Sequence, residues 1–338
     1  MRKVLVTGGS GYIGSHTCLE LLESGYEVVV LDNLSNSSDQ SLKNVEKLTG
    51  KAVTFYQGDI CDGRFLDSIF EKEKIDAVIH FAALKAVGES VVRPLDYYET
   101  NISGTLALLQ VMKKHECKNL IFSSSATVYG HPKTNPIKED ASVSATNPYG
   151  QTKLMAERIL EDVYLSDQSW NIILLRYFNP IGAHPSGELG ESPQSVPNNL
   201  LPYITQVAIG QLPFIKVFGQ DYPTKDGTGV RDYIHVVDLA RGHLAALDHL
   251  EKNEGLEVYN LGTGQGYSVL DLINIMSDVV GRAIPYQIEG RRPGDIATCF
   301  ADPTKAKDKL GWEATFTIVD MCQDAWRWQE NYPNGFNE

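Results

Sequence analysis

Short runs of β-branched and aliphatic residues alternate with helical patterns through the first 180 residues of the chain. The runs are apolar throughout, as in Val28, Val29 and Val30, instead of alternating apolar with polar residues. Such strands are buried on both faces, so the pattern predicts a parallel sheet with helices on each side. The predicted strands are residues 3–7, 27–32, 53–57, 77–81, 119–124 and 172–177. The predicted helices are residues 11–24, 41–48, 64–73, 97–115 and 149–165.

The pattern changes after about residue 179. Loops such as 183–198 and 219–229 are long and rich in Pro and Gly, which is typical of binding loops. Fewer strands are predicted here, at 216–218, 258–261 and 285–288, with helices at 199–209, 237–250, 268–280 and 319–331. We therefore expect an α/β protein with a doubly wound parallel Rossmann sheet in residues 1–180 and a smaller C-terminal α/β lobe in residues 181–338. These boundaries are approximate, and the chain is free to cross between the lobes.

Charge and composition exclude several classes of protein. The 338 residues carry a net charge of −13, which disfavours nucleic acid and anionic membranes as partners. No run reaches the roughly 18 apolar residues of a spanning helix, and the N-terminus has no signal-peptide core, so we expect a soluble, cytoplasmic protein. The five cysteines and eight histidines show no disulfide or metal-ligand spacing, so no metal site is predicted.

A glycine-rich segment follows the first predicted strand and opens the first predicted helix. Gly8 allows a tight turn, Gly11 lets a pyrophosphate approach the backbone, and Gly14 allows close packing. A glycine triplet alone marks only a turn, but the strand–turn–helix context favours a dinucleotide site. Asp32 ends the second strand, where a carboxylate binds ribose hydroxyls and repels a 2′-phosphate, so NAD is favoured over NADP. The alternative role of Asp32 is that of a turn former at a strand end.

Tyr149 and Lys153 lie four residues apart on a predicted helix and therefore share one face. A nearby ammonium and the nicotinamide ring both favour the phenolate, so we predict a lowered tyrosine pKa and proton transfer beside a hydride transfer. Alone, this spacing is usually a surface pair. Three serines, 123–125, follow the fifth predicted strand, where a hydroxyl can hydrogen-bond the reacting alcohol or carbonyl, although a serine run is also typical of a polar turn.

With these residues, the chain resembles the extended short-chain dehydrogenase/reductases, and among them the UDP-sugar 4-epimerases. The resemblance covers essentially the whole chain. It rests on TGGSGYIGSH from Thr7, FAALKAVGES from Phe81, SSSATVYG from Ser123, NPYGQTK from Asn147, LRYFNPIGAHPSG from Leu175 and DGTGVRDYIHV from Asp226.

The resemblance implies three sets of site residues. The catalytic set is Ser125, Tyr149 and Lys153. The NAD set adds Gly8, Gly11, Tyr12, Ile13, Gly14, Asp32, Asn33, Leu34, Ser35, Asn36, Ser37, Asp59, Ile60, Phe81, Ala82, Ala83, Leu84, Lys85 and Phe178, with either Thr100 or Asn101. The UDP-sugar set is Lys85, Ser125, Thr127, Tyr149, Asn179, Asn199, Leu200, Lys216, Val217, Phe218, Arg231, Tyr233, Arg292 to Asp295, and Cys299.

The resemblance also implies the reaction, a reversible 4-epimerisation of UDP-glucose and UDP-galactose through a 4-keto sugar and tightly bound NAD. Cys299 leaves room in the sugar pocket where some members carry Tyr, so N-acetylated UDP-hexosamines are expected substrates too. The alternative for Cys299 is a small core residue. A homodimer through helices such as 97–115 and 149–165 is expected by resemblance alone.

Two other functions stay open from the sequence. A nucleotide-sugar dehydratase or decarboxylase of the same fold is disfavoured, because related dehydratases carry Asp-Glu where this chain has Ala126-Thr127. A non-catalytic NAD-sensing relative is disfavoured by the intact Ser125, Tyr149 and Lys153.

Overall fold

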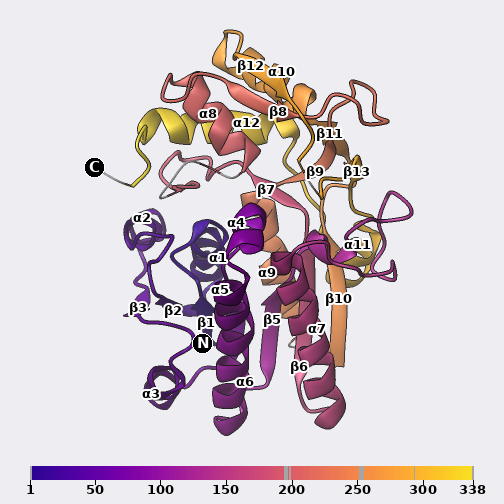
Figure 1. Ribbon diagram of the computed structural model, residues 1–338. Coiled ribbons are helices and arrows are strands. Elements are labelled where there is room, and N and C mark those ends of the chain that lie inside the picture. Colours follow the sequence, from indigo (N-terminus) through magenta and orange to yellow (C-terminus); the bar gives the residue numbers. More distant parts are fainter. Residues whose placement is uncertain (1, 194–196, 198, 251–254, 293, 337–338) are drawn as a thin grey trace.

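The computed structural model describes residues 2–193, 197, 199–250, 255–292 and 294–336 (Figure 1). Within these residues no helix is both long and apolar enough to cross a membrane. A seven-stranded sheet lies below a second lobe that contains the C-terminal helices (Figure 1).

All neighbouring strands of the large sheet run parallel, in the order β10-β6-β5-β4-β1-β2-β3. The chain order reverses between β1 and β4, which makes this the point where a doubly wound sheet binds its ligand. The strands are β1 (Lys3–Thr7), β2 (Glu27–Asp32), β3 (Thr54–Gln57), β4 (Ala77–His80), β5 (Asn119–Ser123), β6 (Asn171–Tyr177) and β10 (Gly255–Leu261). The predicted fold class is confirmed.

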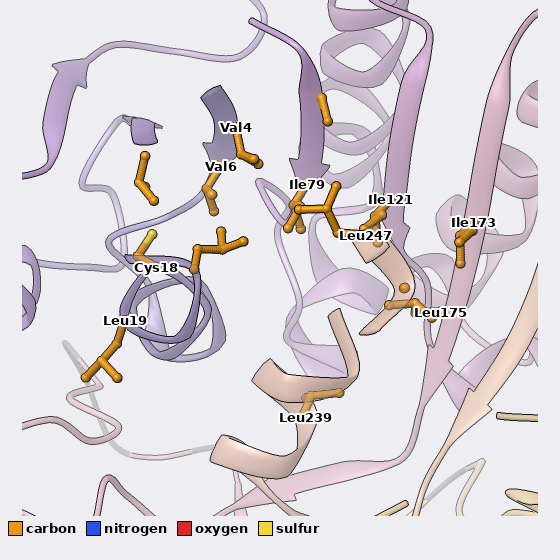
Figure 2. Packing of buried hydrophobic residues seen from close by; sticks show 14 of the residues in the cluster. Val4, Val6, Cys18, Leu19, Ile79, Ile121, Ile173, Leu175, Leu239 and Leu247 are labelled. Atoms are coloured by element: carbon orange, nitrogen blue, oxygen red, sulfur yellow. The ribbon is translucent and has the colours of Figure 1, made fainter. Parts of the chain in front are cut away.

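Successive strand residues face opposite sides of this sheet. Val4 and Val6 pack on one core, whereas Leu5 between them packs on the other. The first core is covered by α1 (Tyr12–Glu23), α2 (Gln40–Thr49) and α9 (Val236–Leu250). Figure 2 shows Cys18 of α1 near Val6, and Leu247 of α9 near Ile79 and Ile121. The second core is covered by α3 (Gly63–Glu73), α6 (Gly104–Lys114) and α7 (Pro148–Ser166).

The C-terminal lobe has a core of its own around Ile204, Met276 and Met321. Its strand β9 pairs with β7, β11 and β13, and β8 pairs with β12. The strands are β7 (Asn179–Ile181), β8 (Ile215–Phe218), β9 (Val230–His235), β11 (Gly266–Ser268), β12 (Tyr286–Glu289) and β13 (Thr298–Cys299). The helices of this lobe are α8 (Leu200–Ala208), α10 (Val269–Val280) and α12 (Ile318–Asn331), whereas α11 (Thr304–Leu310) packs on β10 and α9 of the large sheet.

Several elements differ from the sequence prediction. The elements that it did not predict are β7, β9, β11, β13, α4 (Val87–Val92) and α11, and α9, expected in the C-terminal lobe, packs on the large sheet. The strand expected at 258–261 in the C-terminal lobe is β10, which pairs along its whole length with β6 and completes the large sheet. The single helix expected at 97–115 is broken into α5 (Pro94–Tyr98), the π-helical turn η1 (Glu99–Ser103) and α6, and it is preceded by α4 (Val87–Val92). A π turn closes i→i+5 hydrogen bonds, and hydrophobic periodicity does not reveal it.

Candidate active site

The glycine-rich turn between β1 and α1 forms a close-packed backbone cradle. Gly8 has φ 72°, and a Cβ added there would lie 2.7 Å from the Ala82 nitrogen. A Cβ at Gly14 would lie 2.3 Å from the carbonyl oxygen of Gly8. Gly11 precedes the first helical residue, Tyr12, so the first N–H groups of α1 point out of the helix end without intrahelical partners. This backbone fits a diphosphate group.

Asp32 is held in place at the end of β2 and is 8% exposed. Its Oδ2 accepts from the Ser10 amide at 3.0 Å, and its Oδ1 accepts from the Leu34 amide and the Ser37 hydroxyl, both at 2.9 Å. These bonds fix the 33–37 loop, in which Ser35 and Asn36 are exposed. A fixed carboxylate next to the glycine turn fits the ribose of NAD better than a 2′-phosphate.

Asp59 joins this loop to the end of β3. The Asn33 amide donates to Asp59 Oδ2 at 3.0 Å, and the Cys61 backbone amide donates to Oδ1 at 2.8 Å. The Cys61 amide holds the pKa of Asp59 below its ordinary value, against the opposing effect of burial. The Ile60 side chain points away from the loop into the core under α3 and α6.

Residues 81–85, after β4, lie against the glycine turn. The Phe81 and Ala82 amides donate to the Thr7 carbonyl at 2.9 and 3.0 Å. Asn101, in the π turn, accepts from the Leu84 amide at 2.8 Å and donates back to the Leu84 carbonyl at 3.0 Å.

Asn101 also donates to the Thr152 hydroxyl on α7 at 2.9 Å. Its side chain is therefore engaged with protein groups, while its neighbour Thr100 is half-buried beside it. Ala83 is half-buried in the same segment.

Lys85 connects this segment to the C-terminal lobe. Its Nζ lies 3.3 Å from Glu191 Oε1, which also accepts from Asn199 Nδ2 at 2.8 Å. Tyr12 adds a second connection, because its hydroxyl donates to the Gly182 carbonyl at 2.7 Å. Ile13, next to Tyr12, packs against the core under α1.

The residues Ser125, Tyr149 and Lys153 come from two neighbouring elements. Ser125 follows β5 and caps the 3₁₀ turn η2 (Ala126–Tyr129). Asn147 caps α7 by accepting from the Gly150 amide at 2.9 Å, which places Tyr149 in the first turn and Lys153 in the second. Ser125 and Tyr149 are each 8% exposed, so each retains access to a ligand.

The pKa of Tyr149 differs from the sequence prediction. Burial raises the pKa of Tyr149, and hydrogen bonding with Ser125 partly opposes this shift. Burial also lowers the pKa of Lys153 to about 7, while the charge of Glu157 acts to raise it. In the protein alone the pKa of Tyr149 is therefore raised, whereas the sequence pattern predicted that Lys153 and a bound nicotinamide together would lower it.

Hydrogen bonds orient these groups. Lys153 Nζ donates to the Ser123 carbonyl at 2.7 Å. The Thr127 hydroxyl donates to Ser125 Oγ at 3.0 Å, and the Thr127 amide donates to the same oxygen at 3.2 Å. Because Ser125 Oγ accepts both of these bonds, its O–H is left to donate a hydrogen bond. Such a donor suits a carbonyl or alkoxide oxygen of a ligand.

Two arginines of the C-terminal lobe converge on Asp295. Arg231 Nη2 lies 3.7 Å from Asp295 Oδ1, and Arg292 Nε donates to Oδ2 at 3.1 Å. The Arg292 guanidinium lies 4.7 Å from the ring centre of Phe218. Cys299 is the direct strand partner of Arg231 and packs against the core beside η2. Two guanidinium groups held by one carboxylate fit a diphosphate, which accepts bidentate hydrogen bonds.

Not every predicted residue presents its side chain to this region. Val217 and Tyr233 lie in the core of the C-terminal lobe, and Phe178 lies in the core beside η2. Leu200 packs against the lobe core, whereas Asn179 and Lys216 are exposed. Pro293, within the predicted 292–295 contact, is outside the described residues.

The sequence did not single out four residues that the structure adds to the site. Tyr177 shares a 2.5 Å hydrogen bond with the Ser123 hydroxyl. Glu191 joins Lys85 to Asn199, and Glu157 and Arg176 lie behind Ser125. For Glu157 a signal existed, since it continues the four-residue spacing of Tyr149 and Lys153 on one helix face.

A Rossmann sheet with Ser125, Tyr149 and Lys153 at its carboxyl edge defines the extended short-chain dehydrogenase/reductase class. The model of one family in that class, described as GDP-mannose 4,6 dehydratase, matches residues 5–325. Within the class, the chain belongs to the family of UDP-glucose 4-epimerases.

Three similar proteins support this assignment. UDP-glucose 4-epimerase from Bacillus subtilis is 60% identical over 98% of both chains. The structure of UDP-glucose 4-epimerase from Bifidobacterium longum, in complex with NAD⁺ and UDP, is 56% identical over 99% of this chain and 100% of that chain, with a TM-score of 0.97. The UDP-Glc/GlcNAc 4-epimerase from Campylobacter jejuni is 37% identical over 98% of this chain and 100% of that chain, with a TM-score of 0.85. The predicted family and enzyme class are confirmed, and a dehydratase or decarboxylase is not favoured.

Proposed function

We propose that this chain catalyses the reversible 4-epimerisation of UDP-glucose and UDP-galactose with tightly bound NAD. One observation carries the proposal: Tyr149 is hydrogen-bonded to Ser125, and Lys153 donates to the Ser123 carbonyl, at the carboxyl end of β5. The relatives with NAD and UDP in their structures support the same reading. Residues 1–180 supply most of the cofactor site and the catalytic residues, and residues 181–338 supply most of the sugar-nucleotide site.

Tyr149 is the proton-transfer group. Bound NAD supplies reversible hydride transfer at C4 of the sugar, with no net redox change. Tyr149 removes the proton of the 4′-hydroxyl and later returns it, and Ser125 donates a hydrogen bond to the same oxygen. Because burial raises the pKa of Tyr149, positive charge from Lys153 and the cofactor is needed to favour its phenolate.

The arginines hold the diphosphate while the sugar turns. Arg231 and Arg292 exchange Asp295 for diphosphate oxygens, and Thr127, Lys216, Phe218 and Asn199 surround the rest of the ligand. Asn101 fixes the backbone of Leu84 beside the nicotinamide end, and Thr100 is the better placed of the two residues for a direct cofactor contact.

The sugar pocket accepts N-acetylated UDP-hexosamines as well. Cys299 is small and pairs with Arg231 on the neighbouring strand, which puts it close to the diphosphate position. A UDP-Glc/GlcNAc 4-epimerase among the similar structures supports this second substrate class.

We further propose a cytoplasmic homodimer. Its interface is formed by α4, α5, α6 and α7, where Val91, Val92, Leu95, Leu106 and Met155 are exposed apolar side chains. Exposed apolar side chains that cluster on neighbouring helices are typical of protein interfaces.

The test of the function is direct. Purified protein is incubated with UDP-glucose, UDP-galactose and their 2-acetamido counterparts, without added cofactor, and the epimers are separated. We expect each pair of epimers to reach its own equilibrium ratio, whichever epimer is added at the start. The denatured protein should release NAD or NADH. Activity that depends on added NADP, or formation of a 4-keto-6-deoxy sugar, would contradict the proposal.

A further inference from the structure

A buried ion pair lies behind the Ser125 turn, between α7 and β6. Arg176 donates from Nε to Glu157 Oε1 at 2.9 Å and from Nη2 to Oε2 at 2.6 Å. Glu157 is 1% exposed and Arg176 is 5% exposed. A buried ion pair usually stabilises a fold no better than well-packed apolar side chains, so its place beside the reacting groups points to another role.

The pair holds both ends of the segment that contains Ser125. At the first end, the Ser124 hydroxyl donates to Glu157 Oε1. At the other end, Arg176 Nη1 donates to the Tyr129 hydroxyl at 3.2 Å. Ser125 lies between these anchors, so its position depends on them.

Glu157 also lies on the same helix face as the reacting amine. It lies one helical turn after Lys153, which itself lies one turn after Tyr149, so the three side chains share one face of α7. The charge of Glu157 raises the pKa of Lys153 against the larger effect of burial. Without this carboxylate, the Lys153 amine would lose its proton at a lower pH.

We infer that Glu157 and Arg176 are positioning residues for the proposed epimerisation: their ion pair anchors both ends of the Ser125 turn, and Glu157 lies on the same face of α7 as Tyr149 and Lys153. The inference rests on the proposed function for its kinetic readout, and the anchoring has a readout of its own.

The first variant is Glu157→Gln, which keeps the shape of the side chain and removes its charge. We expect kcat to fall by roughly ten- to a hundredfold, since small misplacements of reacting groups have effects of this size. KM and bound NAD should change little. The alkaline limb of the kcat–pH profile should move to lower pH, because protonated Lys153 is required and its pKa falls.

The second variant, Ser124→Ala, removes one anchor and leaves the charges in place. We expect kcat to fall without a shift of the alkaline limb. Hydrogen exchange of the peptide that spans residues 124–130 should accelerate in both variants, and this measurement does not depend on turnover.

The matched control is Glu20→Gln. Glu20 is a largely buried carboxylate 3.3 Å from Arg241, far from the Ser125 turn, and its variant should keep the wild-type kcat, pH profile and exchange of residues 124–130. If Glu157→Gln fails to fold because Arg176 is left unpaired, the double variant Glu157→Gln/Arg176→Met removes both charges and takes its place.

The outcomes distinguish the proposed epimerase function from the positioning role of Glu157 and Arg176. A wild type that does not interconvert UDP-hexoses overturns the proposed function, while faster exchange at 124–130 in the variants still supports the anchoring. An active wild type with unchanged kcat, pH profile and exchange in Glu157→Gln overturns the positioning role alone. Equal losses in Glu20→Gln would also overturn it, since they would indicate a general loss of stability.

Discussion

Three tyrosines lie near the reacting groups, and their hydrogen bonds distinguish them. The Tyr129 hydroxyl donates to Asn260 at 2.6 Å and accepts from Arg176, and burial raises its pKa to about 12. The Tyr177 hydroxyl is bonded to Ser123. Tyr149 interacts with Ser125 and keeps access to a ligand. Of these three tyrosines, Tyr149 is therefore the one placed to exchange a proton with a substrate.

Tyr149→Phe removes the proton-transfer group and leaves the packing nearly unchanged. We expect turnover to fall by roughly 10²–10⁴-fold, the usual contribution of general acid–base transfer, with bound NAD retained. Steady-state kinetics and the absorbance of released nucleotide measure the two effects. Tyr129→Phe, the comparison variant, should lose much less activity, and an active Tyr149→Phe enzyme would exclude this assignment.

Cys299 tests the sugar specificity. Cys299→Tyr adds a phenol ring beside Arg231, so kcat/KM for UDP-N-acetylglucosamine should fall by about tenfold or more while kcat/KM for UDP-glucose changes little. Cys299→Ser, which keeps the small size, serves as the control and should accept both sugars. Equal kcat/KM ratios for the wild type and Cys299→Tyr would show that this residue does not select the sugar.

At the scale of single elements, local sequence patterns predicted the position of helices such as α1. They did not predict which strands pair when those strands lie far apart in the sequence. The helix predicted at 11–24 is α1 at Tyr12–Glu23, because glycines and apolar spacing mark its start and face. The spacing of Tyr149 and Lys153 was also sufficient to place both on one helix. The depth of burial that raises the Tyr149 pKa arises from packing between elements, and the sequence does not show it. Strand β10 has an ordinary strand pattern, and only its pairing with β6 shows which sheet it joins.

Gly14→Ala tests the role of the glycine-rich turn between β1 and α1 in binding NAD. The new Cβ would lie 2.3 Å from the Gly8 carbonyl oxygen, so the turn must move. We expect purified protein with much less bound NAD and a melting temperature lower by several degrees, consistent with roughly 1–3 kcal/mol of overpacking strain. Gly63→Ala at the start of α3 meets open space and is the matched control. Normal NAD content in Gly14→Ala would contradict the role of this turn.

At the scale of the whole molecule, the loop 182–191 fastens the two lobes together. On the sheet side, Asn44 donates to the Glu188 carbonyl at 2.6 Å, and Lys47 pairs with the Glu188 carboxylate at 3.0 Å. On the other side, Trp328 of α12 donates to the Glu191 carbonyl at 3.1 Å. The lobes therefore share one loop, and we expect them to unfold in a single transition.

Buried histidines make this transition sensitive to acid. Burial lowers the pKa of His16 and His80 to about 3 and that of His243 to about 4. Each takes up a proton on unfolding below its ordinary pKa of about 6.5, so the stability present above pH 6.5 is lost as the pH falls towards 4. Each histidine should contribute about 1 kcal/mol per pH unit. Urea midpoints at pH 7.5, 6 and 5 measure this slope at fixed protein concentration.

His243→Leu removes one of these groups and should make the slope shallower by one proton. The side chain lies against Phe81 and Tyr177, so an apolar replacement is tolerated there. A slope that is unchanged in this variant, or a stability that rises towards pH 5, would refute the assignment.

Substitution of exposed apolar residues in the proposed interface by glutamate tests the dimer. Val92 and Leu95 are 80% and 79% exposed on α4 and α5, so Val92→Glu/Leu95→Glu should give monomers without unfolding. Ile288→Glu on β12, an exposed apolar site of the other lobe, should not change the mass. Size-exclusion chromatography with light scattering distinguishes the outcomes, and a wild-type monomer would reject the dimer.

The late position of β10 in the chain has a consequence for translation. Strand β6 ends at Tyr177, and its outer partner begins only at Gly255. At about 5–20 residues per second, a ribosome leaves the edge of β6 unpaired for on the order of ten seconds. An unpaired strand edge is a template for pairing with other chains. The nascent protein is therefore most exposed to aggregation while its second lobe is being synthesised, and a stall before residue 255 would prolong that interval.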